Sequence, residues 1–73
     1  MQRKILVIIP TYNESDNILR IIPEVIQNSD EENNFFVLVV DDNSPDGTAK
    51  LVKDFNHPSV FILEREGKLG LGT

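Results

Sequence analysis

Residues 35–48 read FFVLVVDDNSPDGT, and this stretch decides the fold. Its first six residues are all apolar, which is typical of a strand covered on both faces in a parallel sheet. The apolar run ends abruptly in the polar residues 41–43. Ser44 followed by Pro45 predicts a helix start, because serine is a favoured N-cap and proline a favoured first helical residue. The stretch therefore predicts a strand, a polar turn and a helix in direct succession.

The flanking sequence repeats this alternation. Lys4–Ile9 and Ser59–Leu63 are two more short apolar runs, and both predict strands. Two amphipathic stretches separate the three strands, with apolar residues at helical spacing over residues 18–26 and 48–55. Strands alternating with helices imply a parallel sheet with right-handed crossovers. The sequence thus predicts an α/β fold of order β-α-β-α-β.

Local signals predict where the elements begin and end. Pro10 should stop the first strand, because proline offers no N–H to the sheet. Asn13 is a good N-cap for the first helix, and Pro23 predicts a kink or a break within it. Residues 28–34 are expected to form a polar loop, and residues 56–58 are expected to close the second helix.

Composition excludes several classes of protein. The chain has 73 residues, no cysteine and a formal net charge of −5. It therefore offers neither disulfides nor thiolate metal ligands, and its charge is the opposite of what a nucleic-acid backbone attracts. Its apolar runs fall well short of the roughly 20 residues that span a bilayer. A three-stranded sheet with an unpaired apolar edge and a trailing glycine-rich loop also leads us to expect an incomplete domain.

Ligands of open α/β sheets bind at the carboxyl ends of the strands, and polar residues gather there. Tyr12 offers a flat face for stacking a base, while Glu14 and Asp42 offer carboxylates to base N–H groups or ribose hydroxyls. After the third strand, Lys68 offers positive charge, and the glycines 67, 70 and 72 let the backbone approach a phosphate closely. This pattern indicates a nucleotide site that lacks a P-loop.

Each of these residues also has a purely structural interpretation. Tyr12 can be an ordinary loop aromatic, Glu14 can favour a helix N-terminus, and Lys68 can be solvated. One of the two neighbouring aspartates, residues 41 and 42, is expected to orient the turn instead of contacting a ligand. Asp46 is expected within the first turn of the second helix, where a carboxylate favours the helix dipole.

Three segments together resemble a known family. VIIPTYNESDNI from Val7, VVDDNSPDGT from Val39 and REGKLGLGT from Arg65 resemble three successive motifs of the inverting GT-A glycosyltransferases of family 2. Within that family they look most like dolichyl- or polyprenyl-phosphate mannose synthases. The resemblance covers nearly the whole chain, and it implies a Rossmann-like nucleotide-sugar-binding domain of which residues 1–73 are the N-terminal, donor-nucleotide-binding part.

The resemblance also implies roles for individual residues. Donor-nucleotide contacts are implied for five residues: Pro10, Tyr12, Glu14, Val40 and Asp42. Lys68 and Gly70 are implied to lie close to the donor diphosphate. The implied donor is GDP-mannose, the implied acceptor is a polyprenyl (dolichyl) phosphate at the membrane, and the anomeric carbon is inverted in the reaction.

The family's metal-binding D-x-D motif is absent from these 73 residues. The resemblance places that motif after a fourth strand, beyond Thr73. We therefore expect Mg²⁺ or Mn²⁺ in the full-length enzyme, and neither a metal ligand nor a catalytic residue in this segment, which should be inactive alone. The full-length protein is expected to be cytoplasmic and peripheral to the membrane face.

Three alternatives remain open from the sequence. The first is a related family 2 enzyme, such as a UDP-glucose-dependent polyprenyl-phosphate glucosyltransferase. The second is a signalling receiver domain, because residues 37–43 resemble its first strand with paired aspartates, although only 31 residues follow Asp42. The third is a non-catalytic nucleotide-binding module.

Overall fold

The computed structural model describes residues 2–66. The candidates Lys68 and Gly70 therefore lie outside the described residues. The elements in chain order are β1 (Arg3–Thr11), α1 (Ile18–Ile26), β2 (Asn33–Asp41), α2 (Thr48–Phe55) and β3 (Val60–Glu64). This order confirms the predicted β-α-β-α-β succession. Within residues 2–66, no helix is long and apolar enough to cross a membrane.

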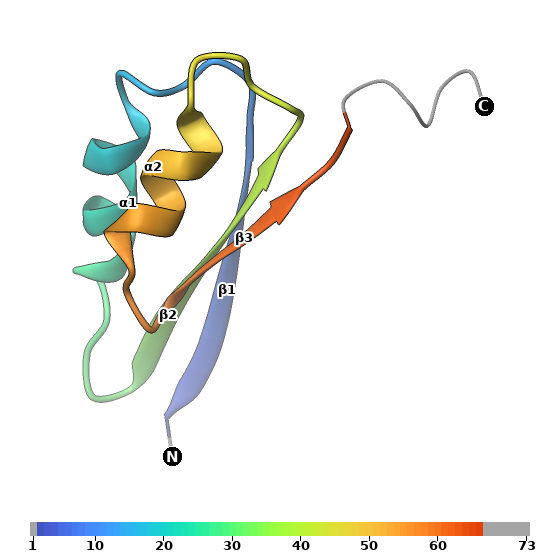
Figure 1. The fold of residues 1–73 in the computed structure, drawn as a ribbon. Coiled ribbons are helices and arrows are strands. Elements are labelled where there is room, and N and C mark those ends of the chain that lie inside the picture. Colours follow the sequence, from blue (N-terminus) through green and yellow to red (C-terminus); the bar gives the residue numbers. More distant parts are fainter. Residues whose placement is uncertain (1, 67–73) are drawn as a thin grey trace.

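The three strands form one parallel sheet in the order β1-β2-β3. Its register pairs Pro10 with Val40 and Thr11 with Asp41 on β1 and β2, and Asp41 with Glu64 on β2 and β3. Both helices lie on the same face of the sheet (Figure 1). Because the strands are parallel, their carboxyl ends lie together at one end of the sheet, which we call the rim.

The core lies between the helices and that face of the sheet. Successive side chains of a strand point to opposite faces, so every second residue faces the helices. Fully or almost fully buried side chains from β2 and both helices form the core cluster: Ile18, Ile22, Val37, Val39 and Val52. Ile9, Val60 and Ile62 pack against this cluster from the outer strands.

The second face of the sheet is open in the described part of the chain. Four apolar side chains on it are each about half exposed: Leu6, Ile8, Phe61 and Leu63. The sequence predicted strands covered on both faces, and residues 2–66 cover only one. Both faces of the sheet are therefore apolar, but one packs against the helices and the other is open within residues 2–66.

The predicted stop of the first strand at Pro10 is wrong, because β1 continues to Thr11. The backbone N–H of Arg3 donates to the carbonyl oxygen of Glu32 at 2.7 Å, and the carbonyl oxygen of Thr11 accepts from the backbone N–H of Asp42 at 3.1 Å. Alternate residues of a strand direct their backbone N–H and C=O groups to the same neighbouring strand. The backbone groups of the odd-numbered residues of β1 are therefore directed to β2. The nitrogen of Pro10 is directed to the opposite edge of β1, which has no neighbouring strand within residues 2–66, so its missing N–H costs none of the described sheet hydrogen bonds.

The predicted start of the first helix at Asn13 is also wrong. Asn13 adopts a left-handed backbone conformation with φ 58°, and α1 begins at Ile18 after Asn17. Pro23 lies inside α1, which runs without a break to Ile26. Of the two alternatives predicted at Pro23, a kink or an end and restart, the end and restart is therefore wrong.

The second helix begins at Thr48 and not at Ser44–Pro45 as predicted. Gly47 precedes it with φ 86°, a left-handed conformation that glycine adopts without steric cost. The helix ends at Phe55, immediately before the predicted closing residues 56–58.

Replacing Ile22 tests the assignment of the core. Ile22 is completely buried on α1, whereas Leu19 on the same helix is 41% exposed. Ile22→Ala should lower the free energy of unfolding by about 2–4 kcal/mol, because it removes buried methyl groups and leaves a cavity. Leu19→Ala should cost less than about 1 kcal/mol. Urea unfolding monitored by circular dichroism measures both, and equal losses would contradict this core.

Candidate functional site

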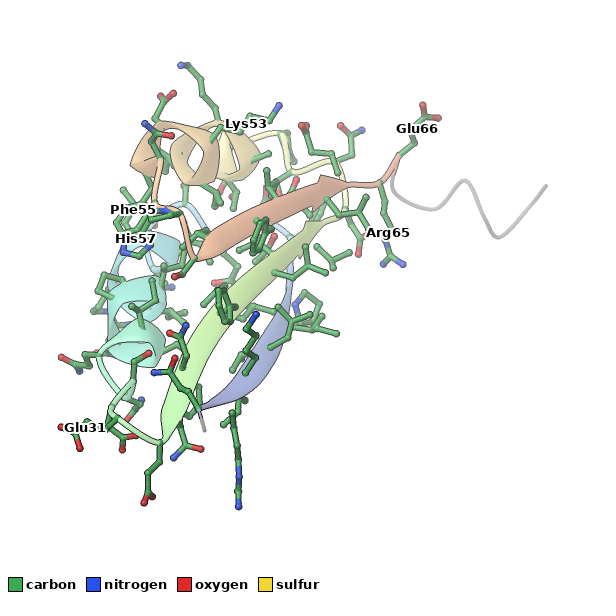
Figure 2. The ribbon with its side chains drawn as sticks, turned by 90° about the horizontal axis from the view of Figure 1, so that it is seen from below. Glu31, Lys53, Phe55, His57, Arg65 and Glu66 are labelled. Atoms are coloured by element: carbon green, nitrogen blue, oxygen red, sulfur yellow. The ribbon has the colours of Figure 1, made fainter. Side chains whose placement is uncertain are left out.

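The loops that follow the strands are connected to one another at the rim. The N–H of Asn13, after β1, donates to the Ser44 hydroxyl at 2.9 Å. The N–H of Ser15 donates to the Asp46 carboxylate at 3.0 Å. Figure 2 shows Arg65 at the rim end of β3, far from Glu31 at the other end of the sheet. Residues that are distant in sequence therefore build one continuous polar edge.

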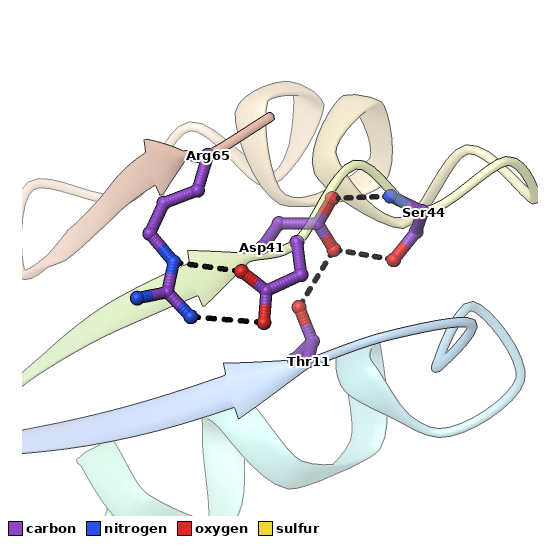
Figure 3. Close-up of polar contacts among 5 residues, drawn as sticks. Thr11, Asp41, Ser44 and Arg65 are labelled. Carbon is purple, nitrogen blue, oxygen red and sulfur yellow. Dashed lines mark hydrogen bonds and ion pairs between the residues drawn. The ribbon is translucent and has the colours of Figure 1, made fainter. Parts of the chain in front are cut away.

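Asp41 is the buried centre of this edge, with 1% of its surface exposed. Its Oδ1 accepts hydrogen bonds from the Thr11 hydroxyl at 2.7 Å and the Ser44 hydroxyl at 2.6 Å, and its Oδ2 accepts from the Ser44 N–H at 2.9 Å (Figure 3). Burial by itself raises the pKa of Asp41, but the hydrogen bonds from Ser44 and Thr11 outweigh it and leave the pKa below its usual value. Asp41 is thus the aspartate that orients the turn.

Asp46 has a second structural role. Its carboxylate accepts from the Thr48 hydroxyl at 2.5 Å, from the Thr48 N–H at 3.1 Å and from the Ser15 N–H. These bonds, led by the one from the Thr48 hydroxyl, lower the pKa of Asp46 to about 2. The sequence placed Asp46 inside the helix as a dipole residue. That prediction is wrong, because Asp46 precedes α2 and links its first residue to the loop after β1.

Asp42 differs from both of these aspartates. Its half-buried carboxylate pairs with the Arg65 guanidinium through both oxygens, with Nε–Oδ1 at 2.7 Å and Nη2–Oδ2 at 3.0 Å. The hydrogen bond from Arg65 lowers the pKa of Asp42, and the same contact raises the pKa of Arg65. Because its partner is another rim side chain and the pair is partly solvated, this carboxylate is accessible to a ligand.

The remaining candidates lie at the carboxyl ends of β1 and β2 and in the loop after β1. Pro10 and Val40 are paired in the register, one residue before the ends of β1 and β2. Both lie on the open face of the sheet. Tyr12 follows β1 with 58% of its surface exposed. Glu14 is half-buried in the next loop, where its N–H donates to the Thr48 hydroxyl at 3.1 Å.

The sequence did not indicate the partners of three rim residues. It gave Thr11 and Arg65 no individual role, and it assigned Ser44 to a helix cap. Thr11 and Ser44 hold Asp41, and Arg65 holds Asp42. The parallel register was the missing signal, since it sets Thr11 opposite Asp41 and Asp41 opposite Glu64, the residue before Arg65.

The described residues do not fit a divalent metal. No group of three or more His, Cys, Asp or Glu side chains within residues 2–66 is placed to hold one. Both oxygens of Asp41 accept from protein donors, and both oxygens of Asp42 face a guanidinium.

Comparison with known proteins gives one consistent result. The sequence profile described as Glycosyl transferase family 2 matches residues 6–73. The polyprenol monophosphomannose synthase of Mycolicibacterium smegmatis is 40% identical over 74 residues, covering 97% of this chain and 27% of that relative. The undecaprenyl-phosphate mannosyltransferase of Micrococcus luteus is 42% identical over 74 residues, covering 94% and 28%. No solved structure gives a significant match. The chain thus spans little more than a quarter of the length of these relatives.

Acid should loosen the rim in a defined pH range. Asp46 has a folded pKa of about 2 against an ordinary value of 3.8, so its contribution to stability is complete above the ordinary value and is lost as the pH falls toward 2. The free energy of unfolding should therefore decline between about pH 4 and pH 2. Asp46→Asn should be less stable at pH 6 and should show a shallower decline. Asp54→Asn, on the exposed surface of α2, is the matched control and should decline like the parent. Urea unfolding at pH 6, 4 and 3 measures this, and an undiminished decline in Asp46→Asn would refute the assignment.

Proposed function

The chain belongs to glycosyl transferase family 2, and from this premise we propose that it supplies the donor-nucleotide site of a mannosyltransferase. The complete enzyme transfers mannose from GDP-mannose to a polyprenyl phosphate, with inversion at the anomeric carbon. The names of both relatives support this proposal. One is a polyprenol monophosphomannose synthase and the other an undecaprenyl-phosphate mannosyltransferase, so each name contains mannose and a polyprenyl group.

One observation carries this proposal, namely the gathering of the nucleotide candidates at the rim. Pro10 and Val40 lie side by side in the register, Asp42 follows two residues after Val40, and Tyr12 follows two residues after Pro10. The carboxyl edge of a parallel sheet is where ligands of open α/β folds bind. A flat base has an exposed aromatic face at Tyr12 and a hydrogen-bond acceptor at Asp42 within this edge.

The geometry at Asp42 does not by itself distinguish guanine from uracil. The two N–H donors of Arg65 occupy the parallel lone pairs of the carboxylate, and the lone pairs that remain diverge. A base therefore has one N–H donor for each free position, which guanine and uracil both supply. The proposal of GDP-mannose over the UDP-glucose alternative rests on the mannose in the names of the two relatives.

The other parts of the proposal concern the complete enzyme. We include Mg²⁺ or Mn²⁺ as a cofactor, with ligands outside residues 2–66, because no described cluster fits a divalent ion. The metal would neutralise the diphosphate as it leaves. Lys68 and Gly70 are proposed to lie near that diphosphate. The polyprenyl acceptor supports an enzyme that acts at the cytoplasmic membrane surface, where such lipid chains are anchored.

Asp42→Ala tests the base contact in the complete enzyme. Loss of a charged hydrogen-bond acceptor should weaken GDP binding by about ten- to a hundredfold. Asp54→Ala, an exposed aspartate on α2, should leave the affinity unchanged. Isothermal titration with GDP measures both. An unaltered dissociation constant in Asp42→Ala would remove Asp42 from the donor site.

Tyr12 gives an independent test of stacking. Tyr12→Ala should weaken GDP binding by about five- to a hundredfold, the range observed when base–aromatic stacking is removed. Tyr12→Phe keeps the ring and should bind GDP like the parent. Equal losses in the two variants would show that the hydroxyl, and not the ring face, makes the contact.

A further inference from the structure

We propose that Arg65 is a positioning residue of the donor site, which acts through Asp42 by fixing the orientation of its carboxylate before the nucleotide binds. This inference rests on the proposed function, since it assigns Asp42 to the nucleotide. Arg65 itself is not among the implied donor contacts.

The backbone of Arg65 is fixed by the sheet. Its backbone N–H donates to the backbone carbonyl oxygen of Asp41 at 2.7 Å, which extends the pairing of β2 with β3 one step beyond the end of β3. Glu64, the residue before it, contacts Lys53 of α2 and therefore lies on the helix side. Alternation then directs Arg65 to the opposite side, beside Asp42. The position of the guanidinium thus follows from the register and not from a mobile loop.

The pairing leaves Asp42 able to bind a ligand. A carboxylate has about four lone-pair positions, and Arg65 uses one on each oxygen. Two contacts fix the plane of the carboxylate, which a single contact cannot do. A base then meets an acceptor that is already oriented, so the ordering cost of this side chain has been met before binding.

Charge supports the same role. The rim holds the carboxylates of Asp41, Asp42 and Asp46, and a nucleotide diphosphate is itself an anion. Arg65 is the cation that contacts this group within residues 2–66. By pairing with Asp42 it offsets the repulsion that this carboxylate exerts on an approaching diphosphate.

Arginine and lysine would differ at this position. A guanidinium offers a rigid planar fork, while an ammonium offers a point charge that cannot bind both oxygens in a fixed plane. If Arg65 orients Asp42, lysine should restore the charge but not the orientation. If it supplied charge alone, lysine should replace it fully.

A double-mutant cycle in the complete enzyme tests this inference, with GDP as the probe. Arg65→Met should weaken GDP binding by about tenfold, the effect expected when one polar side chain loses its preorganisation. In an Asp42→Ala background the same change should have no further effect, because the residue through which Arg65 acts is gone. Arg65→Lys should fall between the parent and Arg65→Met. Lys53→Met, which removes a cation paired with Glu64 on the helix side, is the matched control and should bind like the parent.

The pH dependence of GDP binding separates positioning from a merely structural role. Arg65 lowers the pKa of Asp42, so in Arg65→Met the loss of GDP affinity at acid pH should begin at a higher pH than in the parent. Lys53→Met should keep the profile of the parent. The urea unfolding midpoint of each variant checks that the fold is intact.

Several outcomes would overturn the inference while leaving the proposed function standing. Equal losses from Arg65→Met in both backgrounds would show that Arg65 contacts the nucleotide independently. A gain in affinity would show that Arg65 competes with the base, and no change would reduce the contact to a surface ion pair of small energy. An unchanged affinity in Asp42→Ala itself would instead overturn the proposed function, and this inference with it.

Discussion

The two-residue periodicity of the strands is the constraint on which this site depends. It sends Thr11 and Asp41 to the helix side of the sheet, where they bond to each other in a buried position. It sends the adjoining Pro10 and Val40 to the open face, and it leaves Asp42 at the rim beyond them. Two neighbouring aspartates thereby acquire different chemistry, one as a structural acceptor and one as an accessible carboxylate.

The structural carboxylates make the rim rigid enough to present the accessible one. Asp41 joins β1, β2 and the Ser44 turn, and Asp46 joins the start of α2 to the loop after β1. Charge-assisted hydrogen bonds are stronger than neutral ones, so a few of them can order loops that contain little apolar surface. The left-handed backbone at Asn13, whose N–H donates to Ser44, fits within this network. The cost is sensitivity to acid, since the network needs ionised carboxylates.

The order of the elements was predictable from the sequence, but their ends were not. Apolar runs and helical stripes depend on short-range patterns, and they identified all three strands and both helices. Asn13 and Ser44 looked like helix caps, yet each is used in a contact between loops some 30 residues apart in the chain. Short-range rules cannot detect such a contact. For the same reason the sequence named Asp42 as the ligand candidate but did not identify the side chains that hold Asp41, which the register brings to it.

The composition of the open face suits the ligand that we propose. It is apolar from Leu6 to Pro10 on β1 and from Phe36 to Val40 on β2. One step further it becomes polar at Asp42 and Arg65. A nucleoside has the same division, with apolar ring faces and polar ring edges. Placed across this boundary, a base could lie against apolar side chains and Tyr12 while its edge bonds to Asp42. A free phosphate or a simple cation would use only the polar half. The boundary between the two halves, more than any single charge, therefore favours a nucleotide at this rim.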